Sequence, residues 1–357
     1  MIPVTKTFLP NQDEYQSFLK SSWDKAWLTN RGNLVTSLES KLKTYLEVNS
    51  IIAMTNGTLP IQIAIKALEL KGEIITTPFS YIATTSCIIW EGCKPVFVDI
   101  DPDYLTVDES KIESKITEQT SAILVTHVFG NPCNIEEIQR IAKEHNLKVI
   151  FDAAHCFGVK YNGESVFNFG DISTCSFHAT KLFHTGEGGA LFCNLPELYE
   201  KMFYHHNFGH NGPEAFQGEG TNAKMSELQG AMGHTILPYM DEIIDARKQM
   251  VEKYEEDLNF IGYRSMVLRK NTHWNYSYYP IIFDSDDKLS HVLEVLNKKE
   301  IYPRRYFSPS LNTIEHVKGE QMPISEAISS RVICLPLYFE LKEKDIQLIC
   351  ETINSEV

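Results

Sequence analysis

The sequence predicts an α/β protein built on a mostly parallel β-sheet with helices on both faces. Apolar, strand-like runs occur at 51–54, 73–77, 95–99, 121–127 and 148–152. Helical patterns lie between them, at about 59–69, 81–91, 108–116 and 134–145. Strands that alternate with helices are typical of a parallel sheet, and strand runs without polar interruption predict strands that are covered on both sides.

The length of the chain predicts more than one domain, because 357 residues exceed the size at which one hydrophobic core usually stops growing. We expect an N-terminal arm (1–14), a large domain (15–245) and a smaller C-terminal α/β domain (246–357). The remaining expected elements are helices at 14–25, 35–48, 196–206, 223–255, 287–299 and 342–354, and strands at 171–177, 189–193, 277–283 and 332–337.

Composition excludes several classes of protein. A formal net charge of −14 without a basic patch argues against a nucleic-acid partner. No apolar run is long enough to span a bilayer and no signal peptide is evident, so we expect a cytoplasmic protein with no membrane partner. The 8 cysteines form no C-x-x-C pair, which predicts buried, reduced thiols. No metal site is expected, because His205, His206 and His210 have no cysteine or carboxylate at ligand spacing.

Polar residues follow the predicted strands at the edge of the sheet where ligands bind in such folds. After 51–54, Gly57 permits a close backbone approach and Thr58 offers a hydroxyl at a helix start, which fits either a capped helix or an anion site. Tyr81 follows the next strand and is either a stacking surface for a planar cofactor or a core aromatic. Asp152 comes directly after the strand-like residues 148–151. It is either a helix N-cap or a buried carboxylate that needs a cationic partner.

The stretch 171–190 (DISTCSFHATKLFHTGEGGA) contains one lysine, Lys181, between two strand-like segments. Apolar residues and glycines surround it. A lysine at a strand end in this setting can lose its hydration, which disfavours the charged form and frees a nucleophilic amine for Schiff-base chemistry. A surface lysine on a loop is the alternative, and the stretch alone does not decide between them.

Five motifs in order resemble the DegT/DnrJ/StrS group of sugar-nucleotide aminotransferases. They are Gly57-Thr58, DAAH (152–155), SFHATK (176–181), GEGG (186–189) and NAKMSELQGA (222–231). The resemblance implies the fold type I of pyridoxal-phosphate enzymes and a homodimer whose active sites are shared across the interface. The G-x-G-x-x-G of nicotinamide-dependent enzymes is absent. A sugar-nucleotide-binding regulator without catalysis is the remote alternative, since fold does not fix function.

The resemblance also implies roles for individual residues. Lys181 would bind pyridoxal 5′-phosphate as a Schiff base and then carry protons, and Asp152 would pair with the pyridine nitrogen. Tyr81 and His155 would lie near the ring. Phosphate contacts would come from Gly57, Thr58, Leu59 and Ser176, and from Asn222 of the other subunit. Sugar contacts would come from Trp27, Asn30, Arg305 and Tyr306.

The implied reaction is transamination from L-glutamate, through pyridoxamine 5′-phosphate, to a keto carbon of a nucleotide-linked deoxysugar. Segments such as EIITTPFSYIATTS (73–86) and FDAAHCFGV (151–159) look most like the enzymes that convert dTDP-4-keto-6-deoxyglucose to dTDP-4-amino-4,6-dideoxyglucose for O-antigen or glycan biosynthesis. Amination at carbon 3 or of a UDP-4-keto-sugar remains the alternative.

Overall fold

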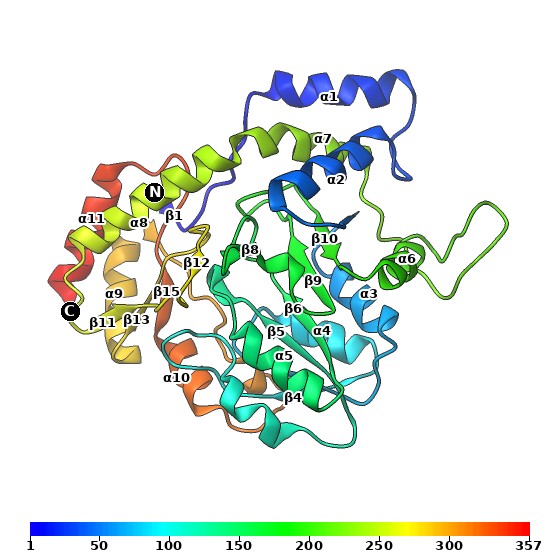
Figure 1. Cartoon of the computed structure of the whole chain (residues 1–357). Coiled ribbons are helices and arrows are strands. Elements are labelled where there is room, and N and C mark those ends of the chain that lie inside the picture. The colour runs from blue at the N-terminus through cyan, green and yellow to red at the C-terminus, as the bar shows by residue number, and fades with distance from the viewer.

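The computed structural model describes residues 1–357 and is organised around one seven-stranded sheet (Figure 1). The strand order is β2–β10–β9–β6–β5–β3–β4. The strands from β9 to β4 in this order run parallel, and β10 is antiparallel to both of its neighbours. The strands are β2 (Ile52–Met54), β3 (Glu73–Thr76), β4 (Lys94–Phe97), β5 (Thr120–Thr126), β6 (Lys148–Asp152), β9 (Ile172–Ser176) and β10 (Gly189–Phe192). The predicted fold class is confirmed.

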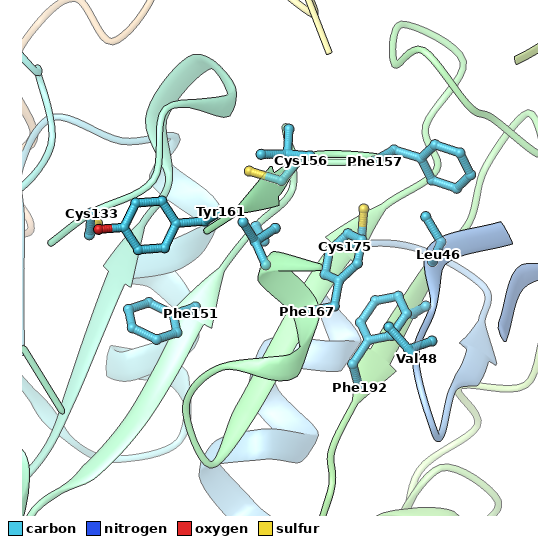
Figure 2. Close-up of a cluster of buried hydrophobic side chains, with 14 of the residues drawn as sticks. Leu46, Val48, Cys133, Phe151, Cys156, Phe157, Tyr161, Phe167, Cys175 and Phe192 are labelled. Atoms are coloured by element: carbon cyan, nitrogen blue, oxygen red, sulfur yellow. The ribbon is translucent and has the colours of Figure 1, made fainter. Parts of the chain in front are cut away.

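Helices cover both faces of the sheet, and for this reason the central strands β5 and β6 carry unbroken apolar runs, Ala122 to Val125 and Val149 to Phe151. Along β5, Ala122 and Leu124 belong to one hydrophobic cluster, whereas Ile123 and Val125 belong to another on the opposite face. The first cluster is covered by α3 (Leu59–Ala67), α4 (Ile82–Trp90) and α6 (Pro196–His205), and the second by α2 (Asn33–Leu46) and α5 (Ile135–Glu144). Figure 2 shows aromatic side chains that fill part of the second cluster, where the Phe167 and Phe192 rings stack with centroids 4.1 Å apart.

The C-terminal part has its own sheet and core. Its antiparallel strands are β11 (Tyr263–Ser265), β13 (Pro280–Phe283) and β15 (Val332–Cys334). Its helices are α9 (Asp286–Lys298), α10 (Pro323–Arg331) and α11 (Glu343–Glu356). The helix α8 (Met240–Asp257) joins the two parts: Met240 and Ile243 pack in the core of the large sheet, and Val251 and Tyr254 pack in the C-terminal core. The predicted boundary after residue 245 therefore falls inside a continuous helix, and the division into domains stays a prediction.

Small strand pairs tie distant segments together. In the arm, β1 (Ile2–Pro3) pairs in parallel with β14 (Ile301–Tyr302) of the C-terminal part. A second small sheet contains β7 (Lys160–Tyr161), β8 (Glu164–Ser165) and β12 (Thr272–His273). These strands have only two residues each, too few to show alternation in the sequence.

Two predicted helices differ in the structure. Residues 108–116 form two 3-10 turns, η1 (Glu109–Lys111) and η2 (Glu113–Lys115), because Ile112 is the single residue of the charged segment that is fully buried. The helix predicted over 223–255 begins only at Glu227, where Ser226 and Gln229 form a capping box. It is then interrupted by the 3-10 turn η5 (Leu237–Tyr239) at Pro238, which separates α7 (Glu227–Ile236) from α8.

All 8 cysteines are buried, as the apolar runs around them predict. None of the helices combines the length and the apolar composition that a bilayer span requires. The remaining short 3-10 turns are η3 (Val128–Gly130), η4 (Val166–Asn168) and η6 (Leu311–Thr313).

A buried carboxylate from α7 completes the start of α2. The N-cap residue of α2 is Gly32, which has no side chain to bond the free N–H groups of the first turn. Glu227 supplies the missing acceptor: its oxygens accept hydrogen bonds from the N–H groups of Leu34 (2.8 Å) and Val35 (3.1 Å). A Cβ atom at position 32 would lie 2.7 Å from the carboxyl carbon of Glu227, so the glycine is needed for this close approach.

We therefore predict that Glu227→Gln destabilises the protein by about 1–3 kcal/mol, because one buried N–H loses its acceptor. The measurement is the midpoint of urea unfolding of the cofactor-free protein. Glu242→Gln, at an exposed position on α8, is the matched control and should leave the midpoint unchanged. Equal midpoints for the two variants would contradict the role of Glu227.

Candidate active site

A cavity of about 440 Å³ opens at the carboxyl edge of the parallel strands, where ligands bind in open α/β sheets. The loops that follow β2, β3, β6 and β9 form one side of it. The other side is made by Tyr278 and the segment 304–309 of the C-terminal part. The predicted site residues that line it are Gly57, Thr58, Tyr81, Asp152, His155, Ser176, Lys181, Arg305 and Tyr306.

Four predicted site residues lie outside this cavity. Leu59 lines a separate groove of about 610 Å³ beside α3 and α4. Asn222 is exposed and its side-chain oxygen accepts a hydrogen bond from Lys224 Nζ at 2.7 Å. Trp27 is 54% exposed and Asn30 is also exposed. Their roles stay predictions, and for Asn222 the predicted contact is to the cofactor of a partner subunit.

Asp152 is the last residue of β6, and its carboxylate is buried. Thr84 Oγ1 donates to Oδ2 at 2.7 Å, and the Ala154 N–H donates to Oδ1 at 3.1 Å. Burial raises the pKa of Asp152, and these hydrogen bonds and the charge of Lys181 oppose the rise. The carboxylate therefore favours a cationic partner inside the cavity.

Lys181 lies in the loop between β9 and β10, and its amine is surrounded by protein. Burial lowers the pKa of Lys181, although the nearby Tyr306 and Asp152 partly oppose this. The amine forms no ion pair with Asp152 or any other carboxylate; its one hydrogen bond is to the Tyr278 hydroxyl at 3.1 Å. The structure thus gives Lys181 the environment that frees a nucleophilic amine.

His155 is held in the floor of the cavity by aromatic stacking. Its ring is nearly parallel to the rings of Phe129 (8°) and Phe307 (13°). The Phe129 N–H donates to His155 Nδ1 at 3.1 Å, and burial holds the pKa of His155 well below its ordinary value. The neutral ring therefore carries its proton on Nε2 and presents a flat, uncharged surface.

The loop after β2 approaches the end of β9 closely. A Cβ atom at Gly57 would lie 2.7 Å from Ser176 Cβ, so only glycine permits this approach. Asn56 was not singled out from the sequence, yet its Oδ1 accepts the N–H groups of Thr58 and Leu59 at 2.9 Å each. The remaining donors for an anion at this loop are the Gly57 N–H and the hydroxyls of Thr58 and Ser176.

Two adjacent arginines at the cavity have different surroundings. Arg305 Nη2 donates to the Ser330 carbonyl at 2.7 Å and contacts Asp286 at 3.3 Å. The guanidinium of Arg304 has no carboxylate partner and stacks over the Tyr306 ring at 5.0 Å. Arg305 is the arginine predicted from the sequence; the structure adds Arg304, whose guanidinium has no carboxylate partner.

The model of the DegT/DnrJ/EryC1/StrS aminotransferase family matches residues 11–354. The chain belongs to this family. It is 40% identical over 358 residues to the dTDP-4-amino-4,6-dideoxy-D-glucose transaminase of Shigella dysenteriae (98% of each chain). The Escherichia coli enzyme of the same name is 36% identical over 362 residues, covering 99% of this chain and 98% of the relative.

A solved structure, that of DesI in the presence of its TDP-sugar product, is similar to this chain with a TM-score of 0.94. The identity is 31%, and the match covers 99% of this chain and 92% of that chain. Together with the family match, this confirms the predicted sugar aminotransferase.

The environment of Lys181 leads to a prediction about stability. The folded pKa is lowered, so between that value and the ordinary lysine pKa of about 10.4 the unfolded state binds more protons. The cost of burying this amine is therefore fully present below the folded pKa and disappears as the pH rises toward about 10.4. We expect Lys181→Met to melt at a higher temperature than the wild type at pH 7, with a smaller difference at about pH 10.

The measurement is thermal unfolding of the cofactor-free proteins at both pH values. Lys270→Met removes an exposed lysine and should show no such pH-dependent difference. A Lys181→Met variant that melts no higher than the wild type at pH 7 would contradict the prediction.

Proposed function

We propose that this chain is a pyridoxal-phosphate-dependent aminotransferase that moves the amino group of L-glutamate to carbon 4 of dTDP-4-keto-6-deoxyglucose. The product would be dTDP-4-amino-4,6-dideoxyglucose. The observation that carries the proposal is that Lys181 and Asp152 line one cavity without pairing with each other. The dTDP sugar and carbon 4 rest on the names of the two relatives in Shigella and Escherichia coli.

The cavity residues fit the cofactor. Lys181 Nζ would hold the aldehyde carbon, and Asp152 would hold the protonated pyridine nitrogen, a cation that offsets the cost of burying its carboxylate. The Gly57 N–H, Thr58 and Ser176 would bind the phosphate where the two loops approach closely. When bound, pyridoxal phosphate supplies a ring that withdraws electrons from the substrate carbon.

The other cavity residues would orient the ring and exclude water. His155 presents a neutral face at one side. Tyr81, at the start of α4, lines the open side and is 63% exposed. Burial lowers the pKa of Lys181, and its Nζ amine, which lines the cavity, would be the group that exchanges a proton with the substrate.

The partner and the compartment are also proposals. The exposed Asn222 would reach the phosphate in the cavity of a second copy, so the active form would be a homodimer. The 8 buried, free cysteines fit a reducing compartment, and we propose the cytoplasm.

The first test is glutamate-dependent amination of dTDP-4-keto-6-deoxyglucose. We expect Lys181→Ala to fold and to abolish turnover, because no other amine lines the cavity. Asp152→Asn should lower kcat by about 10²–10⁴-fold, because a neutral amide cannot hold the pyridine nitrogen in its protonated form. The measurements are steady-state kinetics and circular dichroism of each variant; turnover by Lys181→Ala at the wild-type rate would refute the assignment.

The amino carbon is located by NMR of the product. An amine at carbon 4 supports the proposed reaction. An amine at carbon 3 formed from a dTDP-3-keto-6-deoxy sugar, or turnover only with a UDP-4-keto-sugar, would replace the proposed substrate and keep the aminotransferase. If none of the three sugars is aminated and borohydride reduction traps no cofactor on Lys181, the enzyme hypothesis fails. The alternative, a sugar-nucleotide-binding protein without catalysis, would then be favoured.

Arg304 and Arg305 give a matched pair for substrate binding. Arg304 has an unpaired guanidinium at the cavity, so it is the better candidate to bind an anionic group of either substrate. We expect Arg304→Ala to raise the KM of one substrate by roughly tenfold or more, since hydrogen bonds to charged groups contribute about 1.5–3 kcal/mol. Arg305→Ala should change KM much less, because that side chain is bonded to Ser330 and Asp286. A larger rise in KM for Arg305→Ala than for Arg304→Ala would contradict this assignment and favour Arg305, which the sequence predicts as a substrate contact.

A further inference from the structure

The one hydrogen bond of the Lys181 amine crosses the cavity to the C-terminal part of the chain. Its acceptor is the hydroxyl of Tyr278, at 3.1 Å from Nζ. Tyr278 lies just before β13, and Lys181 lies in the loop after β9, so 97 residues of chain separate them. This contact directly links the proposed nucleophile to the C-terminal wall of the cavity.

The Tyr278 ring is fixed from several sides. It is only 8% exposed and packs against His155 (centroids 4.6 Å apart) and edge-on against Tyr306 (4.9 Å, 75°). The chain just before it is tied to the loop after β6. Asn275 Nδ2 donates to the carbonyls of His155 and Phe157 at 2.9 Å each, and Ser277 Oγ donates to the His155 carbonyl at 3.1 Å. The hydroxyl thus has little freedom to move away from the amine.

We propose that Tyr278 is the positioning residue for Lys181: its hydroxyl accepts one N–H of the amine and so directs the nitrogen lone pair into the cavity. This inference rests on the proposed function, in which Lys181 is the nucleophile. A lysine side chain has four rotatable carbon–carbon bonds, so a single fixed acceptor removes much of the freedom that the amine would otherwise have. Correct placement of reacting groups is worth about 10²-fold for a shift of 1 Å.

The hydroxyl suits this role because it remains neutral. Burial raises the pKa of Tyr278, so the phenol stays protonated across the working pH range. A neutral acceptor also does not hold the amine in its charged form as strongly as a carboxylate does. Tyr278 therefore orients the amine while leaving it able to lose its proton.

The test uses the full-length Tyr278→Phe variant, which keeps the ring and removes the oxygen. The first readout needs no bound cofactor: the pH dependence of Lys181 labelling by a small amine-reactive reagent, followed by mass spectrometry. An oxygen that accepts from the amine favours its charged form, so its removal should lower the labelling midpoint, by about half a pH unit or more. In the loaded enzyme, kcat should fall about tenfold or more while KM for the sugar nucleotide changes less than kcat.

Tyr279→Phe is the matched control. Tyr279 is the adjacent residue; its hydroxyl donates to Glu255 at 2.6 Å and does not line the cavity. This variant should keep the wild-type labelling midpoint and kcat. An unchanged or raised midpoint in Tyr278→Phe, or an equal effect of both variants, overturns the proposal. If Tyr278→Phe lowers the midpoint of Lys181 labelling but the wild type does not transaminate, the proposed function fails and the contact between Tyr278 and Lys181 is still supported.

Discussion

The buried carboxylate of Asp152 is the constraint on which the site depends. A carboxylate at the end of a covered parallel strand is costly unless its oxygens are bonded. The structure meets this need with Thr84 and with the N–H of Ala154. Thr84 is itself bonded to Ser80, whose hydroxyl also contacts Thr126 at 2.9 Å. The ends of β3, β5 and β6 are thereby held together around one negative charge.

The second requirement of the site is that the amine of Lys181 and the carboxylate of Asp152 form no ion pair with each other. If Lys181 paired with Asp152, both groups would be satisfied and neither would favour a ligand. Instead the C-terminal part of the chain supplies the only partner of the amine, the Tyr278 hydroxyl. The site therefore depends on contacts between two hydrophobic cores, and α8, which contributes to both, sets how they are joined. Stability and function are coupled here, because neither core alone forms the cavity.

The sheet could be predicted from the sequence because its signal is local. The centres of β5 and β6 are apolar runs. Gly, Asp and Lys lie at or after the ends of β2, β6 and β9, three strands that run in the same direction, so their ends meet at one edge. What could not be predicted depends on long-range contacts. The two-residue strands carry no periodicity, and Tyr278 reaches Lys181 only through the packing of the C-terminal part. Arg304 and Arg305 are indistinguishable by type, and only the positions of Asp286 and Ser330 decide which guanidinium is engaged.

One side of the cavity is exposed to solvent at Tyr81 in a single chain, and this exposure is relevant to the proposed homodimer. Tyr81, the N-cap residue of α4, is 63% exposed at the cavity. Trp90, at the other end of this helix, is 82% exposed and lines the separate groove beside α3 and α4. Scattered exposed aromatics need no explanation, but Tyr81 lies at the rim of the proposed active site, where a partner that covers it would exclude water. Asn222 lies in an exposed loop that does not reach its own cavity. A second copy that covers Tyr81 and brings its Asn222 to this side would explain both features with one interface, and it would exclude water from the proposed phosphate-binding loop after β2.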